Sequence, residues 1–159
     1  MTDSSTKTSL TYNLARAHRY VHTQLEAKLQ RDGMSVEQWR VLHRLAETNG
    51  QSMGSLARHV LMNHPALTKL ADRMVANGLI DRISDPEDQR RVLVHITDEG
   101  RTSLERVTRT VEDHDRSLEQ IFGHSKSAAL TALLEDLSDE MLDDKPVRGR
   151  KARGAGEVA

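Results

Sequence analysis

The stretch that decides the fold is residues 62–100, which read MNHPALTKLADRMVANGLIDRISDPEDQRRVLVHITDEG. Its first part predicts a helix with one apolar side, because hydrophobic residues recur three, four and one positions apart. Asn63 or His64 can serve as the N-cap, and Pro65 falls in the first turn, where its missing N–H costs nothing. Gly78 ends the helix. The apolar positions are Leu67, Leu70, Met74 and Val75.

Two short runs of β-forming residues follow this helix, at residues 79–83 and 92–97. The polar segment between them, residues 84–91, predicts a hairpin with a long tip instead of a tight two-residue turn. A helix has the diameter to enter the major groove of DNA. Arginines at a hairpin tip can reach a narrow minor groove or the phosphates beside it. The stretch therefore predicts a surface suited to duplex DNA.

The sequence before this stretch predicts three more helices. Apolar residues recur about every 3.5 positions through residues 10–31, which predicts a helix with one apolar stripe. Ser35 begins the next helix, with Gln38 three positions later in a capping-box pattern. A short helix then starts at Ser52 or Ser55. With the helix that follows it, this short helix predicts a helix-turn-helix, and the hairpin makes the unit a winged one.

Two long helices are expected after the hairpin. Residues 97–99 cap the first, and His114 fills a gap in its apolar stripe between Val111 and Leu118. Gly123 breaks this helix and Ser125 starts the last one, whose apolar positions include Leu130, Leu134 and Leu137. The stripes of the first helix and the last two exceed what one compact winged domain can cover, so we expect them to meet a second copy of the chain.

The fold class that follows is mainly α with a small β-hairpin wing. We expect a winged helix-turn-helix lobe at about residues 35–97 that binds DNA, and a helical dimerisation lobe built from residues 10–31 and 98–144, so that one domain covers residues 10–144. Residues 1–9 are polar and expected to be mobile. Residues 145–159 predict a disordered basic tail.

Composition narrows the class of protein. The 159 residues suffice for one domain with a core, and the absence of cysteine excludes disulfides and thiolate metal sites. No signal peptide is recognisable, and no apolar run approaches the roughly 20 residues of a membrane span. We therefore expect a cytoplasmic protein with no membrane partner. No pattern of catalytic residues stands out, so we expect neither an enzyme nor a cofactor.

Net charge argues against a uniformly basic DNA-binding surface. The chain carries a formal charge of −1, with a pI near 6.7. Even residues 35–100 contain 8 Lys and Arg against 9 Asp and Glu. A DNA-binding surface must therefore arise from local segregation, with the acidic residues turned elsewhere.

Side chains of the helix that starts at residue 64 are the candidates for contacts with base edges. Lys69 can contact guanine or a phosphate, and Thr68 can donate a hydrogen bond to either. Pro65 or Ala66 can touch a thymine methyl group, and His64 lies at the same tip. The alternative is an ordinary solvated helix.

Residues of the first helix are candidates for binding a small acid. Arg16, His18 and Arg19 form a basic cluster that a carboxylate ligand would favour. Trp39 is expected in the core and as a wall of the same site. His18 and His22 are one helical turn apart, a spacing that can hold a metal ion, although no third ligand is nearby in the sequence.

The chain resembles the MarR family of bacterial regulators over about residues 10–144. The resemblance lies in the combination of residues 38–42, 55–57 and 65–70 with 72–80, 88–91 and 96–100. It implies an obligate homodimer, a winged helix-turn-helix in each subunit and a small-molecule pocket between the two lobes. It also implies a repressor released by phenolic or other aromatic acids. Some members sense oxidants through cysteine, a mode that this chain lacks.

The resemblance also implies roles for individual residues. Arg73 would contact a phosphate, although a surface ion pair with Asp72 is the alternative. Arg90 would enter the minor groove with Asp88 holding it in place, and Arg91 would lie beside it on the wing. Charged protection of a hairpin edge is the alternative for both arginines. A zinc-responsive regulator and a winged-helix module that binds protein instead of DNA remain the two rival functions.

Overall fold

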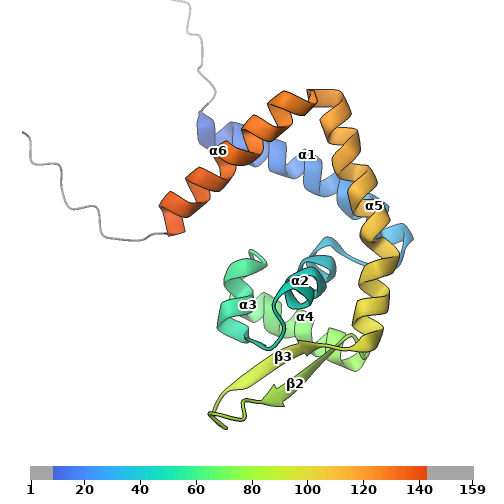
Figure 1. Ribbon diagram of the computed structural model, residues 1–159, viewed down its shortest axis with the longest axis vertical. Helices are drawn as coiled ribbons and strands as arrows, with labels where there is room; N and C mark the ends of the chain where they lie inside the picture. Colours follow the sequence, from blue (N-terminus) through green and yellow to red (C-terminus); the bar gives the residue numbers. More distant parts are fainter. Residues whose placement is uncertain (1–8, 143–159) are drawn as a thin grey trace, which may run out of the picture. The chain divides into compact units, whose positions relative to one another are not determined.

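The computed structural model describes residues 9–142, which form six helices and three strands (Figure 1). The expected mobile N-terminus and basic tail lie outside these residues, apart from Ser9. The chain divides into two compact units within α5, between Asp115 and Arg116, and each is described separately. The elements are α1 (Leu10–Arg31), α2 (Val36–Glu47), β1 (Gln51–Ser52), α3 (Met53–His59), α4 (His64–Ala76), β2 (Ile80–Ser84), β3 (Val92–Ile96), α5 (Asp98–Phe122) and α6 (His124–Leu142).

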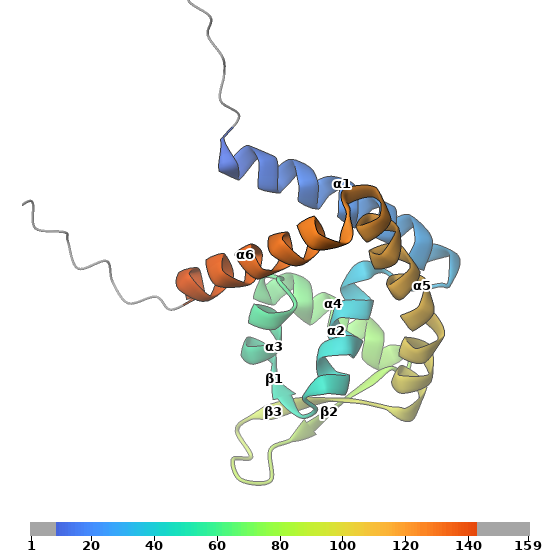
Figure 2. The same cartoon turned by 45° about the horizontal axis from the view of Figure 1, so that its top comes forward.

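The three strands form one antiparallel sheet in the order β1-β3-β2. Ile80 pairs with Ile96 at the base of the hairpin, and Ser84 pairs with Val92 near its tip. Val94 and Ile96 are buried, whereas β2 is exposed beyond Ile80. The base of the hairpin therefore packs on the core, and its tip projects beyond α3 and α4 (Figures 1 and 2). The fold is mainly α with a small β-hairpin wing, as predicted.

Apolar sides of α2, α3 and α4 meet over the sheet, and with buried residues of α1 and α5 they form the core of the first unit. Burying one aliphatic side chain completely stabilises the fold by roughly 1.5–3 kcal/mol relative to leaving it exposed. The apolar periodicity therefore decides how these helices pack. The largest side chains that are fully buried here include Leu42, Leu45, Leu56, Leu67, Met74 and Ile80.

Side-chain caps fix where the helices begin. Ser35 and Gln38 form the predicted capping box of α2. Of the two alternatives for α3, Ser52 is the N-cap, and Asn63 caps α4 by accepting a hydrogen bond from Ala66 N. The turn between α3 and α4 places the exposed Leu61 in the left-handed region at φ 59°. These caps give α3 and α4 the short connection that a helix-turn-helix requires.

Several sequence predictions need correction. Val75 is exposed, and Ala71 takes its place on the buried side of α4, because Ala71 continues the 3–4 spacing from Leu67 while Val75 lies one step further round. Strand β2 runs one residue later than expected, to Ser84. Helix α6 begins at His124 instead of Ser125. Strand β1 was not predicted, since two residues carry no periodic signal.

Thr97 joins three elements at the base of the hairpin. Its hydroxyl donates to the Gly78 carbonyl (2.6 Å) at the end of α4 and accepts from Gly100 N (2.9 Å) in the first turn of α5. Its own N–H donates to the Leu79 carbonyl. Gly100 allows this close approach, because a Cβ at that position would overlap the Leu79 carbonyl oxygen. The end of α4, the sheet and the start of α5 are therefore held as one rigid junction.

His114 lies buried between α5 and α1, in the gap of the apolar stripe that the sequence predicted it would fill. Lys28 Nζ of α1 lies 3.3 Å from its Nδ1. Burial lowers the pKa of His114, and the charge of Lys28 lowers it further, while Asp115 opposes the shift. The imidazole is therefore neutral in the folded chain at neutral pH, and its Nδ1 accepts a hydrogen bond from Lys28.

The second unit contains the last turns of α5 and all of α6. Its two helices contact each other at the Gly123 corner, where His124 Nδ1 lies 3.5 Å from Glu119 Oε2 and Lys126 Nζ lies over the Phe122 ring. The apolar positions of α6, including Leu130, Leu133 and Leu134, are exposed in the single chain.

None of the helices within residues 9–142 combines the length and the apolar character that crossing a bilayer requires.

Replacing Gly100 by alanine is expected to lower the free energy of unfolding by about 3 kcal/mol, because the new methyl group displaces the backbone at the Thr97 junction. Urea denaturation followed by circular dichroism measures the change. Gly54→Ala in α3 is the matched control, since a Cβ there has no atom within 4 Å and alanine favours the helix by up to about 1 kcal/mol. Equal stability of the two variants would contradict the overlap at Gly100.

Acidification is expected to destabilise the fold through His114. An unfolded histidine binds a proton near pH 6.5, whereas folded His114 does so only at lower pH. The unfolded state therefore holds more protons between these values, and the free energy of unfolding falls as pH drops below about 6.5. His114→Leu should weaken this pH dependence in urea titrations. His64→Ala, at an exposed histidine, should retain it.

Candidate nucleic-acid interface

Helix α4 presents the candidate base-contacting residues on its outer side and N-terminal turn. His64, Pro65 and Lys69 are exposed, and Ala66 and Thr68 are half-buried. In this structure the Thr68 hydroxyl donates to the His64 carbonyl (2.9 Å). The side chains lie together on a short helix with a fixed N-terminus, which is the geometry that major-groove contact needs.

Asp72 connects α4 to the wing. Its Oδ1 accepts a hydrogen bond from Arg82 Nη1 of β2 at 2.6 Å. The alternative ion pair between Asp72 and Arg73 is therefore wrong, because the Asp72 carboxylate turns toward the strand. The Arg73 side chain is exposed, and it makes no hydrogen bond or ion pair with the residues that the structure describes. The pairing neutralises one acidic residue and leaves a cation of α4 available.

Two aspartates shape the tip of the hairpin. Asp88 Oδ1 accepts from Arg90 N (3.1 Å), and its carbonyl accepts from Arg91 N. Asp85 is largely buried, accepts from Glu87 N and lies 3.8 Å from Arg91 Nη1. Within the described chain, Arg91 thus has a carboxylate neighbour, whereas the Arg90 side chain makes no polar contact. The tip therefore places Arg91 beside a carboxylate and leaves Arg90 without one, while both side chains are exposed.

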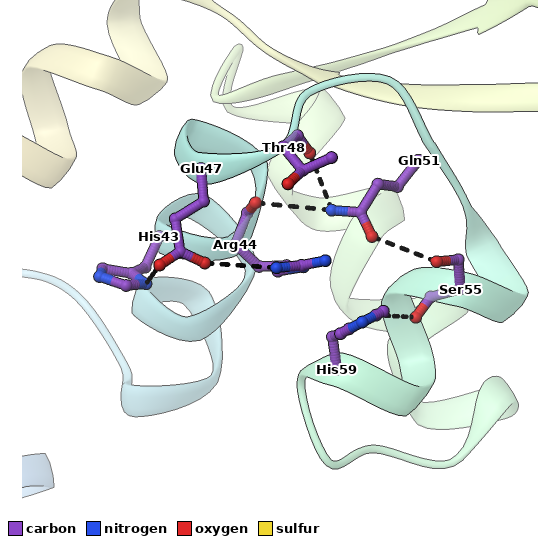
Figure 3. Close-up of polar contacts among 7 residues, drawn as sticks. All are labelled: His43, Arg44, Glu47, Thr48, Gln51, Ser55 and His59. Atoms are coloured by element: carbon purple, nitrogen blue, oxygen red, sulfur yellow. Dashed lines mark hydrogen bonds and ion pairs between the residues drawn. The ribbon is translucent and has the colours of Figure 1, made fainter.

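Gln51 fixes α3 against the end of α2. This buried side chain donates to the Thr48 carbonyl (2.8 Å) and accepts from Ser55 Oγ (3.3 Å), as Figure 3 shows. Asn49 adds a link to the wing, because its Oδ1 accepts from Ile96 N. The residues 49–51 thereby set the position of the helix-turn-helix relative to the hairpin.

Two of the four candidate ligand residues share a hollow. Arg16 and Arg19 line one hollow of about 440 Å³ on α1, together with Tyr12 and Tyr20. The two tyrosines were missed by the sequence reasoning, although Tyr12, Arg16 and Tyr20 lie at successive four-residue steps and therefore share a helix face. Cations beside aromatic rings suit an aromatic carboxylate.

His18 and Trp39 lie apart from that hollow. His18 stacks on His22 with ring centroids 5.5 Å apart, and His22 Nε2 lies 3.7 Å from Glu37 Oε1 of α2. Trp39 packs against the core and beside His43. Residues 9–142 contain no group of three or more histidine, cysteine, aspartate or glutamate side chains placed to hold a metal ion.

Comparison with known proteins assigns the family. A profile described as MarR family matches residues 34–92. The homoprotocatechuate degradative operon repressor of Escherichia coli is 30% identical over 128 residues, which cover 80% of this chain and 86% of the relative. The chain belongs to the MarR family. The transcriptional regulator FarR of Neisseria gonorrhoeae is 29% identical over 138 residues, which cover 87% of this chain and 94% of the relative.

Solved structures agree with this assignment. The crystal structure of the regulator NadR in complex with 4-hydroxyphenylacetate has a TM-score of 0.72 and 29% identity, covering 86% of this chain and 97% of that one. As a member of the MarR family, the chain is a DNA-binding transcriptional regulator with a winged helix-turn-helix. The sequence reasoning found α4 and the wing arginines but missed Asp85 and Arg82. An Asx-turn signal, Asp-Pro-Glu at residues 85–87, was available for the former.

Proposed function

We propose that this MarR-family regulator is a repressor that binds a pseudo-palindromic operator as a homodimer and is released by a small aromatic carboxylate. DNA binding is supported above all by the way in which acidic and basic side chains of the first unit are paired. Asp72 and Asp85 each face an arginine of the wing, while Lys69, Arg73 and Arg90 have no carboxylate partner in the described chain. Local segregation of this kind supports DNA binding despite the net charge of −1.

In this proposal, α4 and the wing contact different parts of the DNA. His64, Pro65, Ala66, Thr68 and Lys69 approach base edges in the major groove, and Arg73 contacts a phosphate. In the wing, Arg90 enters the minor groove from a tip shaped by Asp88, and Arg91 lies beside it with its charge partly met by Asp85.

Unpaired apolar surface supports the homodimer. Leu10 and Tyr20 on α1 and Leu133 and Met141 on α6 are each more than half exposed in the single chain. In the proposed assembly, residues 10–31 and 98–144 form the dimerisation lobe and residues 35–97 the DNA-binding lobe. A two-fold axis would place two copies of α4 about 34 Å apart, one turn of DNA. The proposed place of action is the cytoplasm, where a bacterial operator lies.

Ligand release is proposed to act by population shift. An aromatic carboxylate binds better to dimers whose two α4 helices are wrongly spaced for adjacent major grooves, so DNA affinity falls. The hollow on α1 supports this step with two cations and two tyrosines. The bound 4-hydroxyphenylacetate of the NadR structure, a phenol with a carboxylate, suggests the chemical class to test.

Arg90→Ala is expected to weaken binding about tenfold to every duplex tested, because the minor groove carries little sequence code. Fluorescence anisotropy across a salt series measures both affinity and the slope of log affinity on log salt. Arg31→Ala, at the end of α1, serves as the control for loss of one positive charge. Unchanged binding by Arg90→Ala would remove its role, and a flat salt dependence of the wild type would favour a protein-binding module.

A thermal-shift screen tests the ligand class. At a ligand concentration of about 100 times Kd, we expect 4-hydroxyphenylacetate or a related aromatic acid to raise Tm by roughly 5–10 °C. The uncharged amide of the same compound is the control, because it cannot pair with a guanidinium. Arg16→Gln should reduce the shift. A shift with Zn²⁺ and none with any aromatic acid would instead favour a metal-responsive regulator.

A further inference from the structure

A groove of about 380 Å³ lies between the first turn of α2 and α4. Its apolar residues include Met62 and Leu70, and its charged residues are Lys69 and Arg73 of α4 and Glu37 of α2. The two cations are the ones that the proposed function assigns to DNA. A carboxylate therefore shares a groove with groups that are expected to meet phosphate, and a carboxylate competes for the same donors.

The Glu37 carboxylate lies beside a histidine of a different helix. His22 Nε2 of α1 lies 3.7 Å from its Oε1. Both side chains are about one-third exposed, so each can move. His22 Nδ1 is buried and makes no hydrogen bond within the described residues. The imidazole therefore lies in the α1–α2 seam beside the Glu37 carboxylate.

The seam itself is rigid. Glu26 Oε2 of α1 accepts a hydrogen bond from Val36 N at 2.7 Å, which ties α1 to the first turn of α2. Gln30 Nε2 in turn donates to the other oxygen of Glu26. Because the backbone around Glu37 is fixed in this way, its carboxylate can change partners only by rotating its side chain.

We propose that Glu37 is an internal competitor of DNA phosphate and that His22 restrains it. While His22 holds the carboxylate at the α1 side of the groove, Lys69 and Arg73 are available to DNA. When His22 is removed or engaged by another anion, Glu37 turns to these cations and lowers DNA affinity. This inference rests on the proposed function and adds a residue that sets affinity without contacting DNA.

Fluorescence anisotropy with a labelled random-sequence duplex at low salt tests the proposal. Glu37→Gln should bind roughly threefold to tenfold more tightly than the wild type and steepen the salt slope by up to about 1. His22→Ala should weaken binding by a similar factor. The double variant should bind like Glu37→Gln alone, because removing the competitor makes the restraint irrelevant.

Glu47→Gln is the matched control. Glu47 lies on the same helix as Glu37 and also has a histidine nearby (His43 Nδ1 at 3.9 Å, Figure 3). It pairs with Arg44 of the same helix as well (Nη1 at 3.4 Å), and it does not line the groove. The Glu47→Gln substitution removes the same negative charge as Glu37→Gln and should change DNA affinity less than twofold. The proposal is overturned if Glu37→Gln binds like the wild type or like Glu47→Gln, or if His22→Ala still weakens binding in the Glu37→Gln background.

The outcomes separate this inference from the proposed function. A wild-type protein that binds no duplex at low salt would contradict DNA binding by the α4 surface as a whole. A wild-type protein that binds DNA with an affinity indifferent to Glu37 would overturn only the competition described here. Melting curves of each variant confirm that the folded state is compared throughout.

Discussion

The contact of Thr97 with both Gly78 and Gly100 is the constraint on which the DNA-binding surface depends. One hydroxyl satisfies a carbonyl at the end of α4 and an N–H at the start of α5, so the helix and the wing leave the core from one fixed point. Rotation of the hairpin against α4 would break these bonds at a half-buried site, where an unmet polar group is costly. The direction in which the hairpin leaves the end of α4 is thereby set by backbone contacts.

The positive charge of this surface does not come from an excess of basic residues. It arises because some of the acidic residues are paired with arginines. Asp72 pairs with Arg82, and Asp85 faces Arg91, so these acidic residues are used to hold the wing in shape. Lys69, Arg73 and Arg90 are left without a carboxylate partner in the described chain. A protein with more acidic than basic residues can in this way present cations to a polyanion, since the field close to the surface depends on local groups within about a Debye length.

Helix α1 connects the two proposed activities. One face carries the hollow with Tyr12, Arg16 and Tyr20, and another carries His22, which meets Glu37 of α2. Glu37 in turn lines the groove beside α4. In the proposed scheme, ligand and DNA would therefore act on residues that α1 and α2 link, and coupling between two sites requires such a physical connection.

The sequence by itself determined the helices, their caps and the hairpin. Apolar spacing, Ser35, Asn63 and Gly78 act within a few residues of where they stand, so local rules find them. The resemblance to MarR regulators supplied the family, which the comparisons confirmed. Only the tertiary structure decided that Asp72 meets Arg82, that Glu37 lies beside His22 and lines a groove with Lys69, and that Val75 is exposed. These outcomes depend on contacts between separate elements and on the direction in which each helix packs, and neither is encoded in periodicity.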